Sequence, residues 1–225
     1  NGNPTITTSI RDVQGRSSVR APGSLYYLTG TPTLTAPSTT VIGGRTRTFY
    51  RWEYNRVPQP VGRRTLAVST AANRSARAVY GTNLRGTVTR FGTSCRGTAG
   101  TPLHTVSGTP GVGVNMVYRA SSLRPGAPTF LVLGASNTRW NGIRLPLSLA
   151  FIGAPGCSAY VSQDAVLPMP NLIGSTSLTL RLPTNSSVIG QSIYSQVIVA
   201  DRGANQLGFV LTNGNRIFIG GWQIP

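Results

Sequence analysis

The sequence predicts an all-β protein: an antiparallel β-sandwich with an additional arginine-rich β region at its N-terminal side. Three observations support this prediction. Apolar and polar residues alternate at a period of two over many short segments, and no window of a dozen residues has the 3.6-residue period of an amphipathic helix. Glycine (27 residues) and proline (16 residues) stand between these segments as turn residues. Threonine and valine, which favour strands, are abundant.

Residues 1–20 form a polar lead segment that includes TITTSI, where isoleucine alternates with threonine and serine as in a strand. A lone strand is unstable in water and needs a sheet edge. That edge can belong to its own domain, which is the simpler option, or to a neighbouring subunit. We predict that the segment acts as an arm that pairs with a neighbour. The residues assigned to this arm are Thr5, Ile6, Thr7, Thr8, Ser9 and Ile10.

The arginine-rich region, residues 21–90, contains the segment RTRTFYRWEYNR. As an ideal strand, it places arginines with Phe49 and Glu53 on one face and Tyr50, Trp52 and Tyr54 on the other. We interpret the aromatic face as core, although aromatic rings beside arginine also suit stacking on bases or sugars. The arginine face then meets solvent, a polyanion or a neighbouring subunit. The arginines assigned to this contact are Arg45, Arg47, Arg51, Arg63, Arg64, Arg74 and Arg77.

Residues 91–225 are predicted to form the sandwich domain. Turn residues recur about every 8–15 residues, which favours a two-sheet antiparallel sandwich. Near the end, Asn213-Gly214 lies between two apolar runs and predicts a β-hairpin with a type I′ turn. The segments TFLVLG and QSIYSQVIVAD are continuously apolar, as expected for strands covered on both faces. Alternating strands are predicted in VNMVYRAS, RLPLSLAFIG and STSLTLRLP.

The charge is extreme for a chain in which only 11% of residues are charged. All 21 basic residues are arginine, and with four acids the net charge is +17. A GC-rich genome could account for the missing lysine, but a field this positive also attracts polyanions. We expect an acidic polysaccharide rather than nucleic acid, because capsid proteins usually concentrate basic residues in an arm and here they are spread. No run of about 18 apolar residues is present, so no transmembrane segment is predicted.

Residue types that support catalysis are scarce. His104 is the only histidine, no G-x-S-x-G motif is present, and we predict that His104 lies on the surface or in a loop. Two distant cysteines and one histidine do not make a zinc site. Asp201 is expected to bond turn amides. We therefore predict a non-enzymatic protein without metal or cofactor.

The two cysteines, Cys95 and Cys157, lie in similar glycine-rich turns. A reactive thiol would need His104 or a helix N-terminus nearby to lower its pKa. A disulfide needs only proximity and an oxidising compartment, and closing this loop would contribute about 4 kcal/mol. We predict the disulfide, and with it an extracellular or cell-surface location. The first residue, Asn1, also fits a mature chain that has lost a signal peptide.

From about Phe91 onward the chain resembles the C-terminal β domain of uncharacterised secreted proteins from planctomycete-type, GC-rich bacteria. The resemblance rests on the order of FGTSCRGTAGTP, LVLGASNTRW, LPLSLAFIGAPGCSAYVSQD and SIYSQVIVADRGANQLGFVLTNGNRIFIGG. It implies a secreted β domain in which Cys95 pairs with Cys157. It implies no activity and no catalytic residue.

The function expected from the sequence is that of a secreted, non-catalytic structural subunit. Such a subunit would form a homo-oligomer or polymer in an extracellular or cell-surface filament, tube or coat, with its lead strand paired to a neighbour. The alternatives are a binding module for acidic polysaccharide or another polyanion, and a small β capsid protein.

Overall fold

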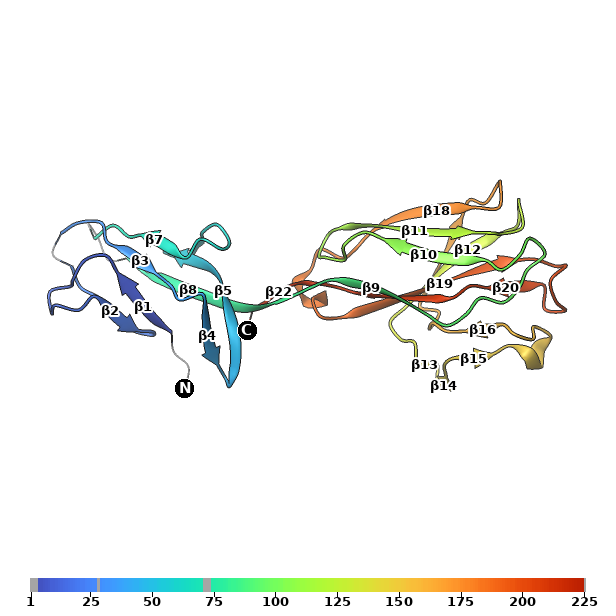
Figure 1. The fold of residues 1–225 in the computed structure, drawn as a ribbon, viewed down its shortest axis with the longest axis horizontal. Helices are drawn as coiled ribbons and strands as arrows, with labels where there is room; N and C mark the ends of the chain where they lie inside the picture. The colour runs from blue at the N-terminus through green and yellow to red at the C-terminus, as the bar shows by residue number, and fades with distance from the viewer. Residues whose placement is uncertain (1–3, 28, 71–73, 225) are drawn as a thin grey trace. The chain divides into compact units, whose positions relative to one another are not determined.

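A computed structural model describes residues 4–27, 29–70 and 74–224, and it confirms the all-β fold (Figure 1). The chain forms two compact units, residues 1–83 with 222–225, and residues 84–221. The lead segment is part of the first unit. The boundary falls earlier than the predicted position near residue 90, because the strand at Thr87–Phe91 pairs inside the second unit.

The first unit contains two antiparallel sheets. One has the order β2-β1-β3-β7, and the other has the order β22-β8-β5-β4 with β6 paired to β5. Ile6 and Leu66 from the first sheet pack with Phe49, Trp52 and Tyr80 from the second, and these side chains form the core of the unit. The strands are β1 (Thr5–Thr8), β2 (Ser18–Arg20), β3 (Thr33–Thr35), β4 (Thr39–Ile42), β5 (Arg45–Tyr54), β6 (Val57–Pro58), β7 (Thr65–Ala67), β8 (Ala76–Leu84) and β22 (Gly221–Gln223).

The lead strand β1 pairs within its own sheet, contrary to the prediction of an exchanged arm. Thr5 to Thr7 pair with β2, and Thr7 and Thr8 pair with β3. Ile6 is buried in the core, while Ser9 bonds to Thr33 and Ile10 is partly exposed. Both edges of β1 are therefore paired within the same chain. Because this pairing and the burial of Ile6 already stabilise the strand, it does not need the sheet edge of a neighbouring subunit.

Strand β5 contains a bulge that changes which side chains share a face. Its register against β8 shifts between Phe49 and Arg51, so Tyr50 is an extra residue. Trp52 consequently lies on the same side as Phe49 and is 1% exposed, which confirms its core role. Arg51 and Glu53 lie on the other side. The predicted grouping of Phe49 with Arg51 and Glu53 is wrong, because strict alternation does not continue through a bulge.

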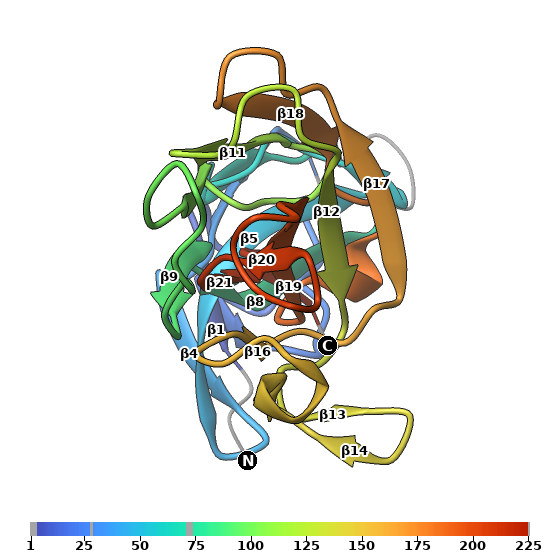
Figure 2. The same ribbon diagram turned by 90° about the vertical axis from the view of Figure 1, so that its right-hand side faces the viewer.

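The second unit is a sandwich. A six-stranded sheet has the order β17-β12-β19-β21-β9, with β20 also paired to β19. The three-stranded sheet β10-β11-β18 lies over one face of it (Figures 1 and 2). Met116 and Tyr118 from the smaller sheet pack on Leu131, Val197 and Ile217 from the larger one. The strands are β9 (Thr87–Phe91), β10 (Leu103–Ser107), β11 (Asn115–Ser121), β12 (Thr129–Gly134), β17 (Ala165–Met169), β18 (Thr176–Arg181), β19 (Ser192–Ala200), β20 (Phe209–Leu211) and β21 (Gly214–Phe218).

The segment between β12 and β17 forms two small hairpins and a turn. The expected strand in RLPLSLAFIG is reduced to a short β15, because the chain then enters a 3-10 turn that ends at Gly153 in a left-handed conformation (φ 89°). Its apolar residues Leu145, Leu147 and Leu149 pack around the disulfide. The elements are β13 (Arg139–Trp140), β14 (Ile143–Arg144), β15 (Leu147–Ser148), η1 (Ala150–Ile152) and β16 (Ser158–Ala159).

The predicted hairpin at Asn213-Gly214 is absent from the described chain. Strands β20 and β21 are both antiparallel to β19 and pair with successive parts of it. They therefore run in the same direction and do not form a hairpin with each other. The Asn213 side chain is buried and bonds to the backbone N–H and C=O of His104. Gly214 is needed for a close approach, since a Cβ there would lie 2.6 Å from the ring of Phe91. Tertiary contacts therefore override the local turn preference.

The predicted disulfide between Cys95 and Cys157 is present, with a Cα–Cα distance of 4.8 Å. Both cysteines are buried in a second core cluster with Ala154, Val210 and Leu211. The bond thus fastens the segment before β10 to the hairpins that cover the other face of the large sheet.

The helical elements of the described residues are the two 3-10 turns η1 and η2 (Ser186–Val188). No helix in this part of the chain could span a membrane.

Candidate functional site

The four carboxylates are all engaged inside the chain. Asp12 accepts hydrogen bonds from the backbone of Gln14 and from Arg16, and Asp164 accepts them from Ala135 and Ser162. The other two, Glu53 and Asp201, contact arginines and are described below. Because each unit has a large excess of arginine over acid, the field around each unit is positive.

On the outer face of β5 and β8, two guanidinium groups gather around one carboxylate. Glu53 lies opposite Arg77 in the strand pair, and Arg51 precedes it on the same face. Glu53 Oε1 lies 3.3 Å from Arg51 Nη2, and Glu53 Oε2 lies 3.6 Å from Arg77 Nη1. The Arg77 side chain is 73% exposed, so its remaining donors point to solvent. Glu53 therefore holds both guanidinium groups in place and leaves that of Arg77 open to solvent.

Two aromatic rings continue this surface. The Arg51 guanidinium carbon lies 5.1 Å from the ring centre of Tyr50, and Tyr50 lies 5.0 Å from Trp222, centre to centre. The bulge turns Tyr50 out of the core face. We call the group of Tyr50, Arg51, Arg77 and Trp222 the arginine–aromatic platform.

Strand β22 brings Trp222 to the platform from the far end of the chain by pairing with β8. This pairing needs a residue without a side chain in β8. A Cβ on Gly81 would lie 2.8 Å from the carbonyl oxygen of Gln223 and 3.4 Å from the Trp222 ring. Gly81 is therefore a packing requirement of the platform.

The platform has the groups that recognise an acidic sugar. A guanidinium group binds a carboxylate or sulfate through paired, charge-assisted hydrogen bonds. The Arg77 side chain is 73% exposed and supplies most of the accessible donors, whereas that of Arg51 is 25% exposed. Flat aromatic rings beside these donors offer an apolar surface on which a sugar ring can stack.

The structure divides the seven arginines assigned from the sequence. Arg51 and Arg77 belong to the platform. Arg47 donates to Thr82 Oγ1 at 2.6 Å, and Arg64 donates through Nε to the Ala36 carbonyl at 2.8 Å, so both support the fold. The remaining three are exposed at separate places: Arg45, Arg63 and Arg74. Sequence reasoning missed the platform roles of Tyr50 and Trp222, because neither the bulge nor the pairing of β22 leaves a local signal.

His104 is buried, not on the surface or in a loop as predicted. It lies in β10, is 0% exposed and is nearly parallel to the Tyr118 ring. Its Nδ1 lies 2.9 Å from the carbonyl of Arg119 and its Nε2 lies 2.9 Å from Ser195 Oγ. Burial lowers the pKa of His104 to about 4. The imidazole is then neutral at pH 7, with Nδ1–H donating to Arg119 and Nε2 accepting from Ser195.

The His104–Ser195 pair has the spacing of a base and a nucleophile, but Ser195 is also 0% exposed. A base needs reach to the proton of a bound substrate, and neither group touches the surface. The pair instead ties β10 in one sheet to β19 in the other. Among the described residues, no group of three or more His, Cys, Asp or Glu side chains could hold a metal ion.

No family model matches this chain, and neither a curated protein nor a solved structure shows significant similarity to it.

Proposed function

We propose that this chain is an extracellular or cell-surface, non-catalytic module that binds an acidic polysaccharide through the arginine–aromatic platform. The observation that supports it is the arrangement of Arg51 and Arg77 around Glu53 beside the rings of Tyr50 and Trp222, which contact each other at an interplanar angle of 40°. A polyuronate or sulfated glycan supplies both features that this surface complements. Its acid groups meet the guanidinium groups, and its sugar rings stack on the aromatic side chains.

The location outside the cell is supported by the buried Cys95–Cys157 disulfide, because such bonds persist in oxidising compartments. In this proposal the second unit is a disulfide-stabilised body and the first unit carries the platform.

The hypothesis of a structural subunit stays a prediction from the sequence. The interface that it assumed, between the N-terminal strand and a neighbouring subunit, is not available in this fold. Its arm, β1, has both edges paired within the chain. The capsid alternative also stays untested. It would require binding of nucleic acid at least as strong as binding of acidic glycan.

Tyr50→Ala tests stacking without changing the charge. We expect affinity for polygalacturonate oligomers to fall about fivefold, since losing about 1 kcal/mol of ring contact corresponds to that factor. Isothermal titration calorimetry measures it, with a neutral glucan as the ligand control. The matched variant is Tyr26→Ala, which removes a tyrosine that is 58% exposed elsewhere in the unit. Equal affinities for Tyr50→Ala and wild type would remove the aromatic part of the proposal, and equal binding of neutral glucan would remove its acidic part.

A further inference from the structure

Large apolar side chains are exposed at one end of the sandwich of the second unit. Leu172 and Ile173, in the β17–β18 loop, are 82% and 81% exposed. At the same end, but on the opposite side of the sandwich, turn η1 has Phe151 74% exposed and Ile152 44% exposed. Figure 2 looks onto this end, with the loops that connect the strands toward the viewer. Single exposed apolar residues are ordinary, but Leu172 and Ile173 are consecutive, and both stand almost fully exposed at a loop tip, which favours an interaction surface.

These loops are tied to one another. Loop 170–174 is anchored on loop 122–128, where Leu123 donates to the carbonyl of Gly174. Loop 201–208 contacts loop 95–101 through Asp201 and Thr98, and contacts η1 through the hydrogen bond from Leu207 N–H to the Gly153 carbonyl. The five segments therefore form one end surface. We call it the loop end.

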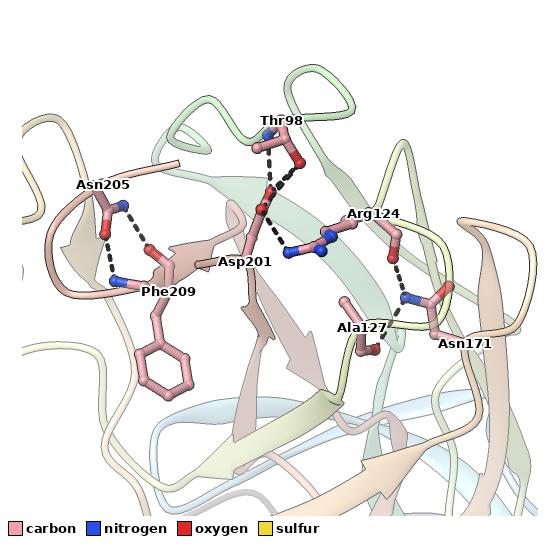
Figure 3. A network of polar contacts seen from close by, with 8 residues as sticks. Thr98, Arg124, Ala127, Asn171, Asp201, Asn205 and Phe209 are labelled. Atoms are coloured by element: carbon pink, nitrogen blue, oxygen red, sulfur yellow. Dashed lines mark hydrogen bonds and ion pairs between the residues drawn. The ribbon is translucent and has the colours of Figure 1, made fainter. Parts of the chain in front are cut away.

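The loop tip that carries Leu172 and Ile173 is fixed by hydrogen bonds from the buried side chain of Asn171. Asn171 is 6% exposed and donates through Nδ2 to the carbonyls of Arg124 and Ala127, at 2.9 and 3.2 Å (Figure 3). The same side chain accepts a hydrogen bond from the N–H of Gly174 at 3.0 Å. Both sides of the tip are thus fixed, so the exposure of the two aliphatic side chains is built into the loop geometry.

The charge presented by the loop end is positive. Its segments contain three arginines, all exposed: Arg96, Arg124 and Arg202. Their one acid is Asp201, which is 2% exposed. Asp201 accepts from the backbone and hydroxyl of Thr98 at 2.7–2.9 Å and lies 3.8 Å from Arg124 Nη1 (Figure 3). As expected, Asp201 bonds a turn amide, although the amide belongs to a different loop. The carboxylate is therefore hidden while the guanidinium groups remain at the surface.

We propose that the loop end docks on an anionic lipid bilayer. Leu172 and Ile173 enter the interfacial region, and the arginines of the neighbouring loops meet lipid phosphates while their stems follow the apolar boundary. A polysaccharide has no apolar phase in which the side chains of Leu172 and Ile173 could be buried. A second copy of the chain would bring two strongly positive bodies together. An anionic bilayer complements both the apolar tips and the positive rim.

The test uses the whole chain and phosphatidylcholine vesicles with or without phosphatidylglycerol, and measures bound protein by co-sedimentation. Wild type should bind the anionic vesicles. The double variant Leu172→Ser/Ile173→Ser should lose about tenfold or more of this affinity. The matched control is Val57→Ser/Val61→Ser, which alters two valines of the first unit that are 58% and 54% exposed. It should bind like wild type.

Unchanged thermal unfolding would show that the Leu172/Ile173 variant is folded, and unchanged binding of polygalacturonate would separate this site from the platform. If the Leu172/Ile173 variant binds anionic vesicles as well as wild type, the tips do not insert and the proposal is overturned. It is also overturned if wild type dimerises without lipid, by sedimentation velocity, and the same variant does not.

Discussion

Removing the disulfide should lower the free energy of unfolding of the second unit by about 4 kcal/mol. The bond closes a loop with a sequence separation of 62, and the chain-entropy relation assigns roughly that stabilisation to a loop of this size. The variant is Cys95→Ala/Cys157→Ala, because alanine leaves no unpaired hydroxyl in the buried cluster around Val210 and Leu211. Urea unfolding of the oxidised wild type and of the variant measures the difference.

Reduced wild type is the control, since it keeps both sulfur atoms and lacks only the bond. It should lie close to the alanine variant in stability. Mass analysis after alkylation without reductant should find no labelled thiol. Two labelled thiols in native protein would contradict both the bond and the argument for an oxidising compartment.

Acidification from pH 7.5 to 4 should cost the second unit about 3 kcal/mol, because His104 must be neutral in the fold. Its pKa in the folded chain is about 4, lowered by burial from an ordinary value of 6.5. The unfolded chain takes up a proton below pH 6.5 and the folded chain does not until about pH 4. The stabilisation is therefore complete above pH 6.5 and is lost progressively as the pH falls to 4.

Urea unfolding across this range measures the effect, and His104→Gln is the control because it removes the titrating group. That variant should be less stable at pH 7.5 and should show a flatter pH dependence between 6.5 and 4. Asp12 does not interfere in this range. Although burial raises its pKa, hydrogen bonds from Arg16 and Gln14 hold it below the usual value of 3.8. Equal stability of the wild type at pH 7.5 and 4.5 would contradict the lowered pKa of His104.

The strands of the second unit could be predicted because their signal is local. VNMVYRAS became β11, TFLVLG became β12 and STSLTLRLP became β18, since alternation or continuous apolarity reflects how many faces of a strand are covered. Asn213-Gly214 shows the limit of this reasoning. Its strong turn preference loses to the buried bonds between the Asn213 side chain and the backbone of His104.

The candidate site is harder to predict from the sequence than the strands are. The arginines were visible by their number, but Tyr50 reaches the outer face only through a bulge, and Trp222 only through pairing of β22 with β8. His104 was misplaced because Gly, Pro and Thr around it suggested a loop. In the fold, the hydrogen bond between His104 Nε2 and Ser195 Oγ gives the buried ring a polar partner, and Ser195 lies 91 residues away in the sequence.

The most direct test of the platform compares two arginine removals that change the net charge equally. Arg77→Ala removes a platform guanidinium, and Arg139→Ala removes one from the exposed hairpin β13–β14 of the second unit. Calorimetric titration with polygalacturonate oligomers should show an affinity loss of about tenfold or more for Arg77→Ala, as expected for a lost charge-assisted hydrogen bond. Arg139→Ala should lose about twofold or less, since distant charges are screened. Equal losses in the two variants would mean that net charge alone attracts the glycan, and would contradict a binding site on the platform.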